Sequence, residues 1–262
     1  MLDCNHLCYR ARYASGSTDP DDIKIATMFG FIRDVDSIRS HHKCRNVAFC
    51  WDAGPYKRAE IYPEYKAHRH EKEMLPEDKA FQQAVQELRK TILPEMGYKN
   101  IFWYKGFEGD DLIASLAQNL SEEDTAVIVS TDHDMFQLLN FNISIFNHKK
   151  FMTYSRFVQE YGVYPHQWAK IKAMSGCSSD NIQGITGVGE KTAIKYLRKE
   201  LSPTAKAYQT IRASRDIVMR NKRLVRLPFE GTPIMELQRD SRVMYDIKQI
   251  MVTIQKATRL KG

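Results

Sequence analysis

Short apolar segments alternate with amphipathic ones over the first 150 residues, and this alternation limits most strongly how the chain can fold. Strands are predicted at 46–51, 100–104, 125–130 and 143–146. A helix is predicted over 77–93, where apolar residues recur at helical spacing between Pro76 and Pro94, and another begins near Gly109. The alternation predicts an α/β fold with a mostly parallel sheet and helices on both faces.

Length and composition exclude several classes of protein. The 262 residues, 43% of them hydrophobic, suffice for one large domain or for one domain with a small lobe. No window approaches the roughly 18 to 20 apolar residues that cross a bilayer, and the N-terminus lacks a signal-peptide pattern. The five cysteines include no CxxC pair, which argues against a disulfide framework and a zinc site. We therefore expect a cytoplasmic protein with no membrane partner.

The net charge of +7 is unevenly distributed along the chain. Residues 1–150 carry 19 Lys/Arg and 23 Asp/Glu, whereas residues 151–262 carry 20 and 9. A basic half beside an acidic half suggests a surface for a polyanion next to a site for cations. A merely solvated basic face would explain the charge equally well.

Acidic residues stand where the predicted strands end. They are Asp3, Asp52, Glu108, Asp110, Asp111, Asp132 and Asp134. Because the carboxyl ends of parallel strands face one crevice, these side chains should converge, which is unfavourable unless cations neutralise them. Mg²⁺ and Mn²⁺ prefer oxygen ligands, and two such ions about 4 Å apart can hold the attacking and leaving oxygens of a phosphodiester.

Each acidic position also has a purely structural explanation. Asp110 and Asp111 could complement a helix N-terminus, residues 130–134 could form a loop with an Asx turn, and Asp52 could be a turn residue. Their joint occurrence at strand ends favours a metal site.

Several segments resemble the 5′ nuclease family, which includes flap endonucleases, phage 5′–3′ exonucleases and the 5′ nuclease domain of bacterial DNA polymerase I. They are FCWD at 49–52, YPEYKAHR at 62–69, EGDD at 108–111, STDHD at 130–134 and GITGVGEKTA at 184–193. The matches occur in family order over roughly residues 1–230. The resemblance implies a PIN-like nuclease domain at 1–150 with a helical arch around 55–95. It also implies a helical basic region at 151–262 with a helix-three-turn-helix element around 171–200.

The resemblance further implies two Mg²⁺ ions, for which Mn²⁺ can substitute. Asp3, Asp52, Glu108 and Asp110 would surround the first ion, Asp132, Asp134 and Asp180 would belong to the second, and Asp111 would lie close to both. The ions would activate a water molecule and leave a 5′-phosphate and a 3′-hydroxyl.

Cations and tyrosines interleave between residues 56 and 69, as suits binding of single-stranded nucleotides. Lys57, Arg58, Lys66 and Arg69 are the cations, and Tyr65 is one of the tyrosines. If the segment is helical, Tyr62, Lys66 and Arg69 share a face. The resemblance implies that Lys66 and Arg69 contact the scissile phosphate and that Tyr65 stacks on the terminal base. A solvated basic helix is the alternative.

A glycine-rich segment at 184–191 is predicted to form a hairpin between helices, since it lacks the spacing of a nucleotide-binding phosphate loop. Gly187 and Gly189 allow close backbone approach, and the helix that begins at Glu190 would present N–H groups to a DNA phosphate. The residues assigned to DNA binding here are Gly187, Gly189, Lys191, Thr192 and Lys195. The family counterpart implies K⁺ bound by hairpin carbonyls. A helix C-cap glycine is the alternative.

One position departs from the family pattern. The family usually has GDxxDN where this chain has GCSSDN at 176–181, so Cys177 replaces a carboxylate of the second metal. A thiol is a poor ligand for Mg²⁺. We therefore expect an active enzyme with a raised metal requirement.

The sequence predicts a structure-specific 5′ nuclease, both flap endonuclease and 5′–3′ exonuclease, that acts as a monomer in replication or repair, for example in removing RNA primers. Its partner would be DNA with a 5′ flap or 5′ end, or an RNA/DNA hybrid. A haloacid-type phosphatase would need a second acid after Asp3, and a PIN ribonuclease usually lacks the hairpin and arch. The alternative outside enzymes is a DNA-structure-binding protein with an impaired second metal site.

Overall fold

The computed structural model of the protein describes residues 1–69 and 74–240 and the single positions 252 and 254. The chain forms two compact units, each built from separate stretches of sequence. The first unit comprises Met1–Asp52, Glu73–Trp103 and Glu236–Gly262, and the second comprises Ala53–Lys72 and Tyr104–Met235. Each unit has a parallel strand pair and its own helices.

The first unit contains three parallel strands in the order β3-β2-β1. They are β1 (Leu2–Asp3), β2 (Phe49–Trp51) and β3 (Ile101–Trp103). The register pairs Asp3 with Cys50, so Asp3 and Asp52 lie near the carboxyl ends of adjacent strands. Strands β2 and β3 are shorter than the predicted segments 46–51 and 100–104, because only these residues pair with a neighbour.

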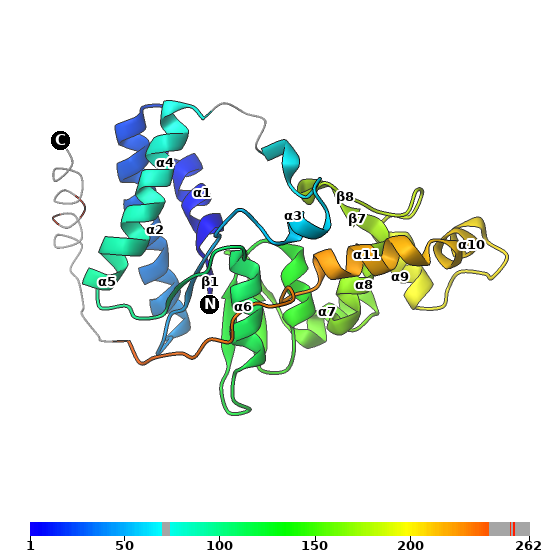
Figure 1. The fold of residues 1–262 in the computed structure, drawn as a ribbon. Coiled ribbons are helices and arrows are strands. Elements are labelled where there is room, and N and C mark those ends of the chain that lie inside the picture. The colour runs from blue at the N-terminus through cyan, green and yellow to red at the C-terminus, as the bar shows by residue number, and fades with distance from the viewer. Residues whose placement is uncertain (70–73, 241–251, 253, 255–262) are drawn as a thin grey trace. The chain divides into compact units, whose positions relative to one another are not determined.

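The helices of the first unit pack against one another, α2 with both α1 and α4 (Figure 1). They are α1 (Cys4–Ser15), α2 (Pro20–His42), α4 (Pro76–Glu87), the π-helical η2 (Leu88–Ile92) and α5 (Leu93–Glu95). The predicted helix over 77–93 is confirmed, although its last turn is π-helical. The long helix α2 has the local start signals of a helix, since Asp19 accepts hydrogen bonds from the N–H groups of Asp21 and Asp22 and Pro20 occupies the first turn.

The second unit contains β4 (Ala126–Val129) and β5 (Ile143–Phe146), which are parallel, and β6 (Phe151–Met152), which is antiparallel to β5. Helix α6 (Gly109–Gln118) begins at the predicted residue, and the 3₁₀ turn η3 (His133–Leu138) follows β4. The α/β fold class with a mostly parallel sheet flanked by helices is therefore confirmed.

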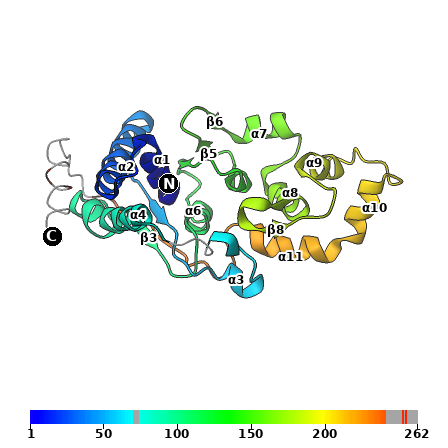
Figure 2. The ribbon, with the colours of Figure 1, turned by 90° about the horizontal axis from the view of Figure 1, so that it is seen from above.

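The rest of the second unit is helical, as predicted, apart from two short strands. The helices are α7 (Tyr154–Tyr161), η4 (Pro165–Gln167), α8 (Trp168–Ser175), α9 (Glu190–Leu197), α10 (Lys206–Ala213) and α11 (Arg215–Val225). Strands β7 (Gly176–Cys177) and β8 (Ile182–Gln183) form an antiparallel pair around the turn η5 (Ser178–Asp180). Helix α8 lies beside both α9 and α11 (Figure 2). Within the described residues, none of the helices has the length and apolar character that crossing a membrane requires.

The segment expected to form the arch is not one continuous helix in its described part. Helix α3 (Arg58–Ile61) ends before Tyr62, which is extended, and the short turn η1 (Ala67–Arg69) follows. Lys66 between them has a φ of 53°, in the left-handed region. The condition under which Tyr62, Lys66 and Arg69 would share a helical face is therefore not met. Residues 70–73 of the expected arch lie outside the described residues.

Candidate active site

Three acidic side chains gather at the start of α6 in the second unit. Glu108 caps the helix, and Asp110 and Asp111 lie in its first turn. Each residue offers a carboxylate oxygen within 4.8 Å of those of the other two. We call Glu108, Asp110 and Asp111 the first acid group. The three carboxylates have different hydrogen-bond and ion-pair partners, and we infer a different role for each.

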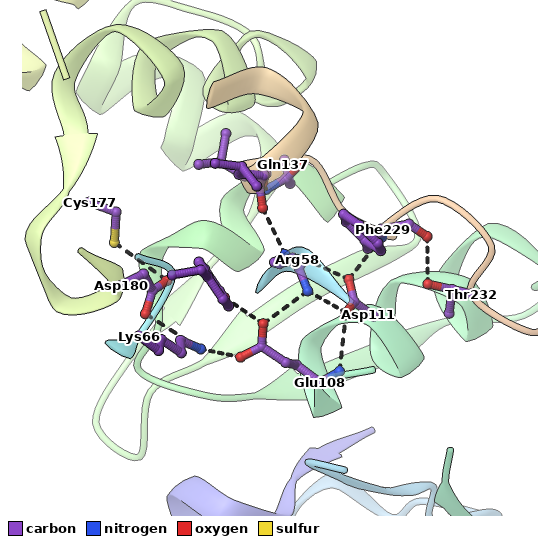
Figure 3. Close-up of polar contacts among 12 residues, drawn as sticks. Arg58, Lys66, Glu108, Asp111, Gln137, Cys177, Asp180, Phe229 and Thr232 are labelled. Carbon is purple, nitrogen blue, oxygen red and sulfur yellow. Dashed lines mark hydrogen bonds and ion pairs between the residues drawn. The ribbon is translucent and has the colours of Figure 1, made fainter. Parts of the chain in front are cut away.

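Asp111 is fully buried and its carboxylate accepts four hydrogen bonds. Arg58 donates two of them from Nη1 and Nη2, at 2.6 and 2.7 Å (Figure 3). The backbone N–H groups of Glu108 and Phe229 donate the others, at 3.1 and 2.8 Å. Because both oxygens are engaged by protein donors, Asp111 anchors Arg58 and two backbone segments. That Asp111 lies close to both metals remains a prediction.

Glu108 is buried and shared among three donors. Arg58 Nη1 lies 2.9 Å from Oε2, the hydroxyl of Tyr65 donates to the same oxygen, and the ammonium of Lys66 donates to Oε1 (Figure 3). Burial by itself would raise the pKa of Glu108, but Lys66 and Arg58 outweigh burial and hold it below its ordinary value. Glu108 is therefore ionised at neutral pH.

Asp110 differs from its two neighbours in the partners of its carboxylate. Its Oδ1 is buried and has no hydrogen-bond partner within the described part of the chain. Burial, followed by the charges of Asp111 and Glu108, raises the pKa of Asp110 well above its ordinary value. A buried carboxylate oxygen without a donor, next to two others, fits a hard divalent cation. The first acid group therefore fits the metal that the sequence predicts.

A second group joins the turn after β4 to the β7–β8 hairpin. Asp134, Cys177 and Asp180 each offer a ligand atom within 4.8 Å of the others, and we call them the second group. The Cys177 Sγ lies 3.7 Å from Asp180 Oδ2 (Figure 3). It also lies 3.1 Å from Ser179 Oγ. Burial, and next the charge of Asp180, raises the pKa of the Cys177 thiol. This thiol is therefore protonated at neutral pH and suits Mg²⁺ poorly.

Two glycines allow the hairpin to bring Cys177 and Asp180 into this position. Gly176 has a φ of 78°, and a Cβ there would lie 2.4 Å from the backbone nitrogen of Gly184. A Cβ on Gly184 would lie 2.3 Å from the carbonyl of Ser175. Because real side chains do not tolerate these distances, glycine is required at both positions.

Ion pairs with two lysines neutralise the carboxylates of the second group. Lys172 Nζ, on α8, lies 3.1 Å from Asp134 Oδ1. Lys66 Nζ lies 3.4 Å from Asp180 Oδ1 and also contacts Glu108 (Figure 3). Burial, together with Asp132, raises the pKa of Asp134 to about 6 although Lys172 acts in the opposite direction. The second group thus offers two carboxylates and a thiol, a weaker donor set for a hard cation than the first group.

Several predicted site residues have other surroundings than expected. Arg58 is buried with 2% of its surface exposed, so it is a counterion of the acid groups and no surface contact for DNA. Tyr65 is 5% exposed and packs in an apolar cluster with Ile182 and Leu224, which leaves no open ring face for a terminal base. Lys57 lies over the ring of Phe107, 4.4 Å from its centre. The side chain of Arg69 lies outside the described residues.

Asp3 and Asp132 have capping contacts, and Asp52 has a backbone contact with α1. Asp3 accepts a hydrogen bond from the N–H of His6 at the start of α1. The N–H of Asp52 donates to the side chain of Asn5. Asp132 caps η3 by accepting from the N–H of Asp134 at 2.8 Å, as the Asx-turn alternative suggests. That these three residues bind metal remains a prediction.

The glycine hairpin leads into α9 as predicted. Gly187 has a φ of 78°, and a Cβ at either Gly187 or Gly189 would meet no atom within 4 Å. Lys191 and Lys195 are exposed on α9, and Thr192 is half-buried there. This backbone is open to a ligand, and DNA binding by these residues remains a prediction.

Two site residues were missed by the sequence interpretation. Lys172 lies one helical turn before Gly176, and nothing in the sequence relates it to Asp134. Gln137 donates to the carbonyls of Asp134 and Val225, at 2.9 and 3.0 Å, and accepts from the N–H of Leu227. It thereby ties the end of α11 to the turn that carries Asp134. The three-residue spacing from Asp134 to Gln137 was the available signal.

Comparison with known sequences identifies relatives of this chain. The sequence model described as "5'-3' exonuclease, N-terminal resolvase-like domain" matches residues 1–162. A thermostable DNA polymerase I of Thermus caldophilus is 32% identical over 203 residues, which are 76% of this chain and 24% of that protein. A 5′–3′ exonuclease of Bacillus subtilis (strain 168) is 33% identical over 213 residues, covering 76% of this chain and 69% of the relative. The chain thus spans about a quarter of the polymerase's length.

Solved structures share the fold. A 5′-exonuclease of bacteriophage T5 with bound zinc superimposes with a TM-score of 0.73 at 20% identity, covering 100% of this chain and 98% of that one. The catalytic core of Rad2 in complex with DNA superimposes with a TM-score of 0.52 at 13% identity, covering 99% and 85%. At these identities the likeness concerns the fold.

Proposed function

Because the chain belongs to the 5′–3′ exonuclease family with the N-terminal resolvase-like domain, we propose that it is a structure-specific 5′ nuclease. It hydrolyses phosphodiester bonds of DNA at 5′ flaps and 5′ ends and leaves a 5′-phosphate and a 3′-hydroxyl. The cofactor is Mg²⁺, for which Mn²⁺ substitutes, and K⁺ binds to carbonyls of the hairpin 184–189. The role belongs to replication or repair, including removal of RNA primers.

The observation that supports this function best is the buried Oδ1 of Asp110 without a hydrogen-bond donor. The surrounding cations do not supply one, since Arg58 is bound to Asp111 and Glu108, and Lys66 to Glu108 and Asp180. A chain that retains such a carboxylate needs a partner for it, and a divalent cation is the partner that a nuclease uses.

The residues of the site have separate tasks in this proposal. Divalent cations, when bound, lower the pKa of a coordinated water and stabilise charge on the phosphate. Asp110 would hold the first cation beside Glu108, whose oxygens already accept from Arg58, Tyr65 and Lys66, and Asp134 and Asp180 would hold the second. Arg58 fixes the orientation of Glu108 and Asp111 through its planar fork. Lys66 contacts the scissile phosphate, and α9 binds the backbone of the duplex. No side chain is needed as a covalent nucleophile.

A labelled 5′-flap duplex tests the proposed function. We expect cleavage near the base of the flap with Mg²⁺, none with EDTA, and products that carry a 5′-phosphate. Binding of the duplex without cleavage in either Mg²⁺ or Mn²⁺ would instead indicate a DNA-structure-binding protein. Release of inorganic phosphate from a monoester substrate, with the flap left intact, would indicate a phosphatase.

Cys177 sets the metal requirement in this proposal. We expect the Cys177→Asp protein to reach half-maximal activity at an Mg²⁺ concentration about tenfold lower than the natural protein, because a carboxylate replaces a protonated thiol. The measurement is flap cleavage over an Mg²⁺ titration, and Cys177→Ser, which removes the sulfur without adding a charge, is the control. Identical curves for the natural and Cys177→Asp proteins would contradict the expected role of this position.

A further inference from the structure

Lys172 is a half-buried cation in direct contact with a candidate metal ligand. Its side chain is 15% exposed and that of Asp134 is 12% exposed, and the ion pair between them measures 3.1 Å. The ammonium group of Lys172 is thus in direct contact with a carboxylate oxygen of the second group.

Lys66 has the same relation to the other carboxylate of this group. Its side chain is 10% exposed, and its ammonium lies between Asp180 and Glu108 (Figure 3). The backbone holds it there, since the N–H of Lys66 donates to the carbonyl of Asp180 at 3.0 Å and the side chain of Asn181 donates to the carbonyl of Glu64 at 2.9 Å. The two lysines thus reach the second group from segments that are far apart in the sequence.

The two acid groups therefore differ in the charge that they offer a cation. In the second group the carboxylates of Asp134 and Asp180 each have an ammonium partner, and the Cys177 thiol adds no charge. In the first group the carboxylate of Asp110 has no ion pair within the described residues. A dication is attracted by net negative charge and opposed by nearby ammonium groups. The first group should bind it tightly and the second weakly.

We propose that Lys66 and Lys172 are built-in competitors of the second divalent cation, which binds fully only when an ammonium leaves its carboxylate. This inference rests on the proposed two-metal function. Because Lys66 would also contact the scissile phosphate, DNA would draw it away from Asp180 and favour the second cation. Binding of DNA and of this cation would then strengthen each other equally, as linkage requires.

Mn²⁺ binding by the free protein tests the proposal without any catalytic step. Free Mn²⁺ is measured by electron paramagnetic resonance during titration of the natural protein, Lys172→Met and Lys170→Met. Lys170 lies on the same helix, is exposed and has no ion pair in the described chain, so its variant loses the same charge away from the site. We expect one tight and one weak class of site. Lys172→Met should strengthen the weak class about tenfold, because one ammonium no longer opposes the ion.

The outcomes separate this inference from the proposed function. If the weak class of sites binds Mn²⁺ equally well in Lys172→Met and Lys170→Met, and the tight class is unchanged, the inference is overturned and the proposed function is not. No Mn²⁺ binding by any of the three proteins would overturn the inference together with the metal-dependent function. Thermal melting checks that each variant is folded, and Lys172→Gln replaces Lys172→Met if the latter is not. A Lys66→Met protein that also binds the weak ion more tightly would support the same competition.

Discussion

Asp110→Asn should reduce flap cleavage on the order of a thousandfold and, in EDTA, make the protein more stable. Activity falls because the first cation loses a ligand. Stability rises by about 1 to 3 kcal/mol because a buried carboxylate without a donor becomes a neutral amide. We would measure single-turnover cleavage and, separately, unfolding by urea in EDTA.

The pH dependence of this gain follows from the direction of the pKa shift. Folding raises the pKa of Asp110, so between the unfolded value of about 3.9 and the folded value the native state holds the proton more strongly. As the pH rises through this window Asp110 loses its proton, and the free energy of unfolding of the natural protein falls. The advantage of Asp110→Asn should be absent near pH 3 and grow towards neutral pH. A gain in stability from Asp110→Asn that is the same near pH 3 and at neutral pH would contradict the raised pKa assigned to Asp110.

Asp111→Asn is the matched control, since it makes the same chemical change one residue away. Asp111 accepts four hydrogen bonds, two of them from Arg58, so an amide there would leave donors unpaired. We expect a loss of stability of about 3 to 5 kcal/mol, opposite in sign to the effect at Asp110. Equal effects of the two substitutions on stability would contradict the separate roles proposed for these neighbours.

Arg58→Met should cost about 3 to 5 kcal/mol of unfolding free energy and most of the activity. Arg58 is 2% exposed, pairs with Glu108 and Asp111, and donates through Nε to the carbonyl of Leu224 at 2.8 Å. Its loss leaves Asp111 without its counterion and leaves Glu108 with Lys66 alone. Arg58→Lys should restore little, because a lysine lacks the planar fork that reaches all these acceptors. Urea unfolding and cleavage rates provide the two measurements.

Lys57→Met is the control for Arg58, because it removes the neighbouring cation, which lies over the ring of Phe107. Its expected cost is below about 1 kcal/mol. The difference in unfolding free energy between Arg58→Met and Lys57→Met should be smaller at acid pH. Arg58 helps to hold the pKa of Glu108 low in the folded protein. The stability that this pair contributes is therefore present above the pKa of Glu108 in the unfolded chain, and it is lost as the pH falls through the pKa of Glu108 in the folded protein. An Arg58→Met protein as stable as Lys57→Met at neutral pH would show that Arg58 is no structural counterion.

Periodicity predicted much of the fold, and it failed where tertiary contacts decide the backbone. The strand at 143–146 and the starts of α6 and α9 were predicted to the residue, because local patterns and helix-start signals specify them. The sequence left open a helix around Lys66, and the structure has no continuous helix there. The left-handed φ of Lys66 is stabilised by hydrogen bonds to the loop at 180–181, over a hundred residues away in the sequence.

By itself the sequence determined the α/β class, the positions of the acidic residues at strand ends and the replacement of a carboxylate by Cys177. These features depend on residue type and short spacing, which a sequence displays directly. Only the tertiary structure decided which acids are already bound to protein groups. It assigns Asp111 to Arg58 and Asp134 to Lys172, and it leaves the buried Oδ1 of Asp110 without a donor. The physical reason is that the charge available to a metal depends on which cations folding brings into contact with each carboxylate.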